Sequence, residues 1–162
     1  MPHTTAVNVS VFFGICGRLI PTSAACVSGS LAIGLAYEAI RHGQQTVMVA
    51  GGAEEISVSQ AAVFDTLFAT STLNDRPTET PKPFDATRDG MVVGEGAGTL
   101  VLEDLEHAQA RGATIHAEIT GFGTNSDGNH VTQPTAKTMA AAMRAALSVA
   151  DIPSTEIGYV NA

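Results

Sequence analysis

Cys26 is the residue whose type and position point most directly to chemistry. It follows a segment, 18–25, that we expect to form a short strand, at a sheet edge or irregularly paired because of Pro21. It opens a run, 26–42, whose apolar residues recur at helical spacing. The positive end of a helix dipole favours the thiolate form of a cysteine in the first turn. Backbone N–H groups of that turn lack helical partners, so they can donate to the oxyanion that forms when a thiolate attacks a thioester. The pattern predicts a nucleophile for acyl transfer.

The residues beside Cys26 are small and agree with this hypothesis. Ala24, Ala25, Ser28 and Gly29 leave room for an extended acyl chain next to the sulfur. A buried cysteine with a purely structural role at a strand-to-helix junction explains the local pattern about equally well. The chain has two cysteines, without CxxC or zinc-ligand spacing, and we interpret both as free thiols.

Alternating strands and helices are expected to position this thiol. Gly43 is predicted to cap the helix at 26–42, and small residues such as Gly34 make that helix thin, which implies close packing. The continuous apolar run at 46–50 is typical of a strand covered on both faces and predicts a parallel sheet. Residues 1–15 fit either a helix or a strand. Further strands are predicted at 99–102, 116–121 and 157–160, helices at 57–68, 104–111 and 135–150, the last capped by Thr135, and an irregular loop at 70–89.

Composition excludes several other classes of protein. The chain has 162 residues, of which 44% are apolar and 15% charged, and this predicts a globular domain with a core of Ala, Val, Leu and Ile. The net charge of −8 and the scattered basic residues disfavour nucleic acid as a partner. Neither a signal pattern nor an apolar stretch of membrane-spanning length is present, so we expect a cytoplasmic protein without a membrane partner.

Several motifs, in order, resemble those of the β-ketoacyl-acyl-carrier-protein synthases of the fatty-acid elongating type. TSAACVSG at 22–29 resembles the nucleophile motif of these ketosynthases, and VMVAGGAE at 47–54 resembles the strand that follows it. RDGMVVGEGAG at 88–98 is similar to the family's glycine-rich segment. The resemblance continues through LEDLEHA at 102–108, GFG at 121–123, SDG at 126–128, HVT at 130–132 and YVNA at 159–162.

This resemblance implies an α/β fold of the thiolase-like type, layered α-β-α around a mixed, mostly parallel sheet. Residues 1–112 would form the C-terminal part of the N-terminal ketosynthase half, which carries the nucleophile, and 113–162 would begin the C-terminal half. In the family, the strand that YVNA resembles leads directly into a His-Gly-Thr motif. We therefore expect a central fragment, truncated at both ends.

The family also implies a decarboxylative Claisen condensation in fatty-acid biosynthesis. Cys26 would accept an acyl group from a carrier-protein thioester, and two histidines would help to decarboxylate malonyl-acyl-carrier protein. None of the five histidines of this chain matches those two positions, so the fragment alone is expected to be inactive. The implied partners are acyl-carrier protein, acyl and malonyl thioesters and a second copy in a homodimer. No cofactor is implied, because phosphopantetheine arrives on the carrier protein.

Two further residues are candidate substrate contacts by resemblance. Thr132 falls on a loop that would line the entrance for the phosphopantetheine arm and could bind the substrate amide; local hydrogen bonding within the loop is equally consistent with its position. Phe64 resembles an aromatic residue of the acyl pocket, and ordinary core packing is the competing interpretation.

Three rival functions are weighed against this one. GEGAG at 94–98 is superficially similar to a dinucleotide-binding loop, but it precedes a predicted strand, whereas that motif follows one. A thiolase-type or acyltransferase-type thiol enzyme would share the activated cysteine without the decarboxylation. A non-catalytic partner subunit, like a chain-length factor, typically lacks the nucleophile, so Cys26 argues against it.

Overall fold

The computed structural model describes residues 3–130 and 132–161, which divide into two units. The first unit comprises 1–51 and 99–162, and the second comprises 52–98. Strands β1 (Val47–Glu54) and β2 (Gly96–Glu103) each run across a boundary between the units. The described residues contain both helices and paired strands, so the α/β prediction is confirmed.

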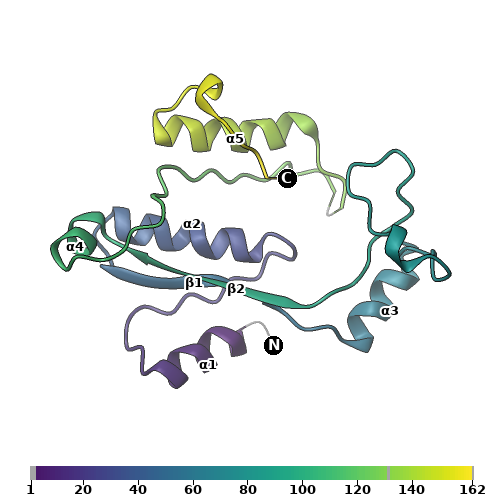
Figure 1. Cartoon of the computed structure of the whole chain (residues 1–162), viewed down its shortest axis with the longest axis horizontal. Helices are drawn as coiled ribbons and strands as arrows, with labels where there is room; N and C mark the ends of the chain where they lie inside the picture. The colour runs from purple at the N-terminus through teal and green to yellow at the C-terminus, as the bar shows by residue number, and fades with distance from the viewer. Residues whose placement is uncertain (1–2, 131, 162) are drawn as a thin grey trace. The chain divides into compact units, whose positions relative to one another are not determined.

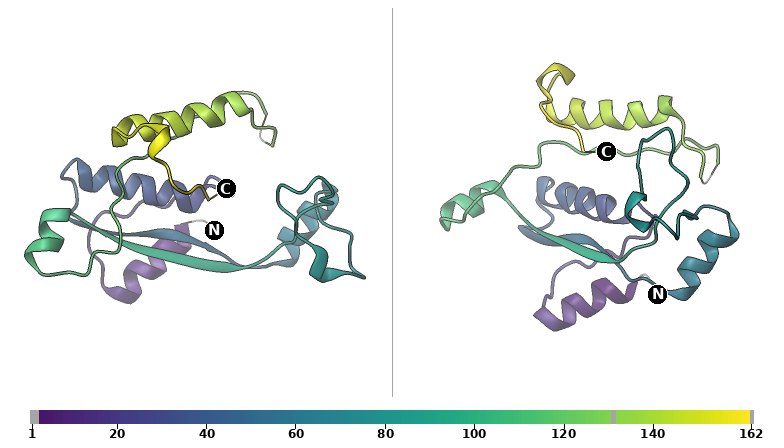
Figure 2. Two further views of the ribbon diagram at one scale, coloured as in Figure 1. Left: turned by 45° about the horizontal axis from the view of Figure 1, so that its top comes forward. Right: turned by 45° about the vertical axis from the view of Figure 1, so that its right-hand side comes forward.

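The first unit is built in layers around the paired strands. Figure 1 shows α2 (Ser28–Arg41) on one face of the pair and α1 (His3–Phe13) on the other. An extended segment, residues 116–123, runs between α2 and α5 (Ala136–Ala150), and both views of Figure 2 agree with this order. The remaining elements of this unit are α4 (Leu105–Ala110) and the short 3₁₀ helix η2 (Ser154–Glu156).

The two strands form an antiparallel pair. The N–H of Asp104, directly after β2, donates to the carbonyl of Thr46, directly before β1, at 2.9 Å. The end of one strand therefore meets the start of the other. The prediction of a parallel sheet was wrong for this pair, because a continuous apolar run reports burial and carries no information on strand direction.

Three predicted strands are absent from the described residues, and the reason is the same for all. Segments 18–25, 116–121 and 157–160 are irregular or extended, without a ladder of hydrogen bonds to a neighbour in the described chain. Alternation in a sequence favours an extended backbone, but a strand also requires a partner to pair with. At 18–25, Pro21 additionally removes one backbone donor.

Helices were predicted more accurately, because their ends carry local signals. Ser57 accepts from the N–H of Gln60 and Thr135 from that of Thr138, so each begins a helix as an N-cap. Gly43, at φ +67°, follows α2 and donates to the carbonyl of Ile40, which confirms the predicted cap. Residues 3–13 of the ambiguous first segment form α1.

Small residues bring α2 against the extended segment. The side chains that are buried in the described chain are alanines, Ala36, Ala39, Ala50 and Ala108, so the predicted contribution of Val, Leu and Ile to the fully buried core is not found. A Cβ atom added to Gly34 would lie 2.2 Å from the ring of Phe122. The predicted close packing of the thin helix is thus confirmed.

The same extended segment meets α5 on its other side. Cβ atoms added to Gly121 and Gly123 would each lie 2.3 Å from a carbonyl oxygen of α5. The hydroxyl of Tyr37 on α2 donates to the carbonyl of Thr120 at 2.9 Å. The segment is therefore held between two helices by backbone and ring contacts, without a strand as neighbour.

The second unit contains α3 (Val58–Thr66), the 3₁₀ helix η1 (Pro77–Glu79) and the long loop predicted at 70–89. The carboxylate of Asp89 accepts from the hydroxyl of Ser71 at 2.6 Å and from the N–H of Thr72 at 3.0 Å. Gly90 follows at φ +152°, and a Cβ atom there would lie 2.4 Å from the backbone of Thr70. Asp89 and Gly90 together close the base of the loop.

Ionic hydrogen bonds connect Glu103, the last residue of β2, with His107 on α4 and Arg111 directly after it. The Glu103 side chain, 9% exposed, accepts from Arg111 Nε at 2.7 Å and Nη2 at 2.6 Å, and its Oε1 lies 2.5 Å from His107 Nδ1. The hydrogen bond from Arg111, with a further one from His107, lowers the pKa of Glu103 from 4.5 to about 2, against the opposing effect of desolvation.

Gly34→Ala is expected to destabilise the protein. Alanine is the better helix former by about 1 kcal/mol. Its methyl group would nevertheless displace the Phe122 ring, and overpacking of this kind costs about 1–3 kcal/mol. Urea denaturation of the full-length protein measures the difference, with Gly158→Ala as control because no heavy atom lies within 4 Å of that position. A Gly34→Ala protein at least as stable as the wild type would contradict the packing argument.

Glu103→Gln is expected to make the free energy of unfolding less dependent on pH in the acidic range. Because the folded pKa lies below the unfolded value, the contribution of Glu103 is complete above about pH 4.5 and is lost as the pH falls toward 2. The difference in urea midpoint between wild type and Glu103→Gln should therefore shrink from pH 6 to pH 3. Glu106→Gln, an exposed position on the neighbouring helix α4, serves as control. A difference that stays constant over this range would refute the assignment.

Candidate active site around Cys26

Cys26 lies on a tight turn that leads into α2. It is exposed and its thiol is free. The helix was predicted to begin at Cys26, but it begins two residues later, at Ser28, with Val27 as its N-cap residue. Ala25, immediately before it, has φ +50°, a left-handed conformation that is unfavourable for any residue with a Cβ atom. The thiol is therefore carried by a strained turn at the amino end of the helix.

Hydrogen bonds within the turn use some of its amides and leave others open. The N–H of Val27 donates to Ala24 and that of Ser28 donates to Ala25, at 3.3 and 3.1 Å between N and O. Among the described residues, the N–H groups of Cys26, Gly29 and Ser30 have no hydrogen-bond acceptor. Donors that could face an oxyanion are thus present, although two of the amides near Cys26 are occupied.

Two hydroxyl groups also bind the turn, and the sequence interpretation missed both. Ser28 Oγ lies 2.8 Å from the N–H of Ala24 and 2.7 Å from the carbonyl of Ala25. Thr22 Oγ1 donates to the carbonyl of Ser28 at 3.1 Å. Ser and Thr beside a helix start are a known signal for side-chain bonds to the backbone, and that signal could have identified them.

Thr132 makes local hydrogen bonds in its loop. Its N–H and its hydroxyl each lie 3.2 Å from Nδ1 of His130. The side chain is exposed. The local bonding considered for this residue is therefore present, and a role toward substrate stays a prediction.

Phe64 lies on α3 in the unit formed by 52–98, whereas Cys26 and Thr132 belong to the other unit. Phe64 is half-buried, and its carbonyl accepts from the N–H of Ala69 at the end of the helix. Its predicted place in an acyl pocket is likewise not tested by these contacts.

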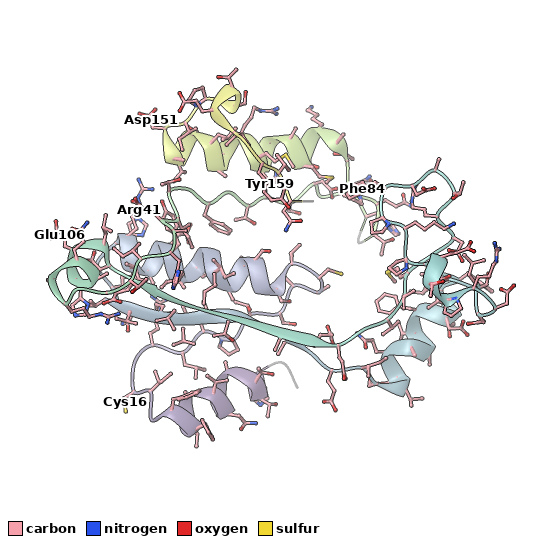
Figure 3. All side chains as sticks on the ribbon, in the orientation of Figure 1. Cys16, Arg41, Phe84, Glu106, Asp151 and Tyr159 are labelled. Atoms are coloured by element: carbon pink, nitrogen blue, oxygen red, sulfur yellow. The ribbon has the colours of Figure 1, made fainter. Side chains whose placement is uncertain are left out.

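The second cysteine is separate from this turn. Cys16 follows the end of α1, as Figure 3 shows, and its thiol donates to the carbonyl of Gly14 at 3.4 Å. Within residues 3–130 and 132–161, no group of three or more His, Cys, Asp or Glu side chains could hold a metal ion. Over the same residues, no helix is both long and apolar enough to cross a bilayer.

Comparison with known families matches almost the whole chain. The model of the β-ketoacyl synthase N-terminal domain matches residues 1–108, and that of the C-terminal domain matches 116–162. The 3-oxoacyl-[acyl-carrier-protein] synthase 2 of Vibrio harveyi is 46% identical over 99% of the chain. A putative polyketide β-ketoacyl synthase 1 of Streptomyces halstedii is 44% identical over 99%. The chain spans 39% of the length of each of these curated relatives.

Solved structures agree with these relatives. A β-ketoacyl synthase from Burkholderia phymatum superposes with a TM-score of 0.97 at 68% identity, over 100% of this chain and 40% of that one. The ketosynthase of a type II polyketide synthase, solved in complex with its acyl-carrier protein, gives a TM-score of 0.90 at 34% identity, over 97% of this chain and 40% of that one. The resemblance found in the motifs is confirmed: the chain belongs to the β-ketoacyl synthase family.

Proposed function

We propose that the full-length protein condenses an acyl group, held as a thioester on Cys26, with malonyl-acyl-carrier protein in fatty-acid biosynthesis. The observation that carries this proposal is the exposed, free thiol of Cys26 on a strained turn at the amino end of α2, in a chain of this family. The curated relatives named 3-oxoacyl-[acyl-carrier-protein] synthase support the fatty-acid pathway.

The reaction has two half-steps, and Cys26 takes part in both. Its thiolate attacks the carbonyl carbon of the acyl thioester, and the tetrahedral oxyanion collapses to acyl-Cys26 with release of the carrier thiol. The malonyl thioester then loses CO₂, and the resulting enolate carbon attacks acyl-Cys26. A carbon–carbon bond forms, the thiolate of Cys26 leaves, and the 3-oxoacyl product stays on the carrier.

The open amides of the turn suit the first half-step. The N–H groups of Cys26, Gly29 and Ser30 lie within five residues of one another along the chain at the positive end of α2. Groups of this kind stabilise the negative charge of the oxyanion as it develops. We propose the N–H of Cys26 as one such donor, because the attacking sulfur and that N–H belong to the same residue.

The partners follow from the same proposal. Acyl-carrier protein would deliver both thioesters on its phosphopantetheine arm, so the enzyme needs no cofactor of its own; a related ketosynthase has been solved with its carrier protein. We further propose a homodimer located in the cytoplasm. The full chain would have a thiolase-like, layered fold in which 1–112 contribute to the N-terminal half and 113–162 to the C-terminal half.

The non-catalytic alternative is disfavoured by the thiol itself. A ketosynthase/chain length factor structure is 33% identical to this chain, so the resemblance covers assemblies that contain both kinds of subunit. A chain-length-factor-like subunit has no need of a nucleophile. Cys26 at the family's nucleophile motif, on a turn that presents it to solvent, supports the catalytic role.

Phe64 and Thr132 are proposed as substrate contacts. Phe64 would line the acyl pocket, and its half-buried ring on α3 keeps part of its surface available. Thr132 would bind an amide of the phosphopantetheine arm, exchanging its local bond with His130 for one with the substrate.

Substitution of Cys26 should abolish acyl transfer. Full-length Cys26→Ala is expected to incorporate no acyl group from an acyl-carrier thioester and no label from an epoxide inhibitor of condensing enzymes, because the attacking sulfur is gone. Cys16→Ala removes the other exposed thiol and should react like the wild type. Peptide mapping by mass spectrometry identifies the modified residue, and an adduct elsewhere than Cys26 would refute the proposed function.

Substitution of Thr132 should weaken binding of carrier-bound thioesters more than it slows the reaction. Loss of one hydrogen bond of about 0.5–1.5 kcal/mol corresponds to a KM about 2- to 10-fold higher for Thr132→Val, with kcat little changed. Thr132→Ser keeps the hydroxyl and should stay near the wild type. Thr124→Val, an exposed position of the same segment, is the control. An unchanged KM in Thr132→Val would contradict the contact.

A further inference from the structure

The backbone before Cys26 adopts a conformation that needs support. Ala25 has φ +50°, where its Cβ atom crowds the following carbonyl. Such a conformation persists only when surrounding interactions hold it. Since Cys26 is the next residue, the conformation of Ala25 determines the direction in which the thiol leaves the chain.

One hydroxyl group spans this strained residue. Ser28 Oγ accepts from the N–H of Ala24 at 2.8 Å and donates to the carbonyl of Ala25 at 2.7 Å. The two peptide groups that it bonds lie on either side of the turn at Ala25. The N–H of Ser28 donates to the same carbonyl at 3.1 Å, so Ser28 holds that oxygen with both its backbone and its side chain.

Ser28 is itself fixed in place. It is the first residue of α2, so its backbone belongs to the helix, and its side chain is half-buried. Thr22 Oγ1 donates to its carbonyl at 3.1 Å, which ties the incoming segment to the same point. The hydroxyl of Ser28 therefore connects the turn that carries the thiol to the rigid start of the helix.

We propose that Ser28 is a positioning residue for Cys26: its hydroxyl holds the left-handed turn at Ala25 and thereby aligns the thiol with the open amides at the start of α2. This inference rests on the proposed function and deepens it. Ser28 does not touch the reacting atoms. It acts through the backbone of Ala24 and Ala25, so its loss should slow acyl transfer without removing the thiol.

The test compares full-length wild type with Ser28→Ala, Ser28→Thr and Ser23→Ala. Two rates are measured for each: acylation of Cys26 by an acyl-carrier thioester in a single turnover, and alkylation of Cys26 by iodoacetamide, both followed by mass spectrometry. Ser23 is exposed on the segment that leads into the turn and its hydroxyl makes no hydrogen bond among the described residues, so it is the matched control.

Ser28→Ala is expected to lower the maximal acylation rate about 10- to 100-fold, because misalignment by about 1 Å can cost as much as 100-fold in rate. The thioester concentration at half-maximal rate should change by less than about 3-fold. Alkylation needs only an accessible thiol and should also change by less than about 3-fold. Ser28→Thr, which keeps the hydroxyl, should recover most of the acylation rate, and Ser23→Ala should match the wild type.

The outcomes separate this inference from the proposed function. Wild type that is not acylated on Cys26 overturns the function, and the inference with it. Acylation in wild type with an equal rate in Ser28→Ala overturns the positioning role alone, as does an equal loss of acylation and alkylation. If Ser28→Ala does not fold, Thr22→Val removes the supporting bond to the carbonyl of Ser28, and it should show the same selective loss of acylation in smaller degree.

Discussion

The contact between α2 and the segment around Phe122 holds the first unit together. Gly34 has no side chain, so the ring of Phe122 packs directly against the helix backbone, where a Cβ atom would lie 2.2 Å from it. Behind the ring, Gly121 and Gly123 bring the same segment against α5. Residues that match the family's N-terminal domain thus meet residues that match its C-terminal domain, and α2, which begins at the turn of Cys26, is fixed between the sheet and this contact.

How much of this fold could be predicted depends on how local the determining interaction is. The ends of α2, α3 and α5 follow from Gly43, Ser57 and Thr135, whose bonds reach only three or four residues. The antiparallel direction of β2 relative to β1 involves residues far apart in sequence, such as Asp104 and Thr46, and the prediction of a parallel sheet was wrong there. The prediction of a strand at 116–121 was wrong because this extended segment contacts helices α2 and α5. The residue types of an extended segment do not reveal which elements it packs against.

The site shows the same division. A nucleophilic role for Cys26, which stays a prediction, was inferred from its residue type, its expected place in the first turn of a helix and the motif around it. The left-handed backbone of Ala25 was not, because an alanine gives no sign of positive φ, and without that turn the hydroxyl of Ser28 looked like one more small neighbour. Phe64 and Thr132 were proposed from resemblance alone, and their hydrogen bonds, with Ala69 and His130, are local ones. Their roles toward substrate depend on a ligand and stay predictions.

Where Gly34 meets the ring of Phe122, α2 has no side chain that could adjust to a change in the position of the helix. Rotation of α2 about its axis would drive the neighbours of Gly34 into Phe122, and a shift along its axis would break the bond from Tyr37 to Thr120. Because the turn of Cys26 is continuous with the amino end of α2, a displacement of the helix would also displace the thiol. A substitution at Phe122 that shifts α2 would therefore be expected to shift Cys26 as well, although the two residues match different domains of the family.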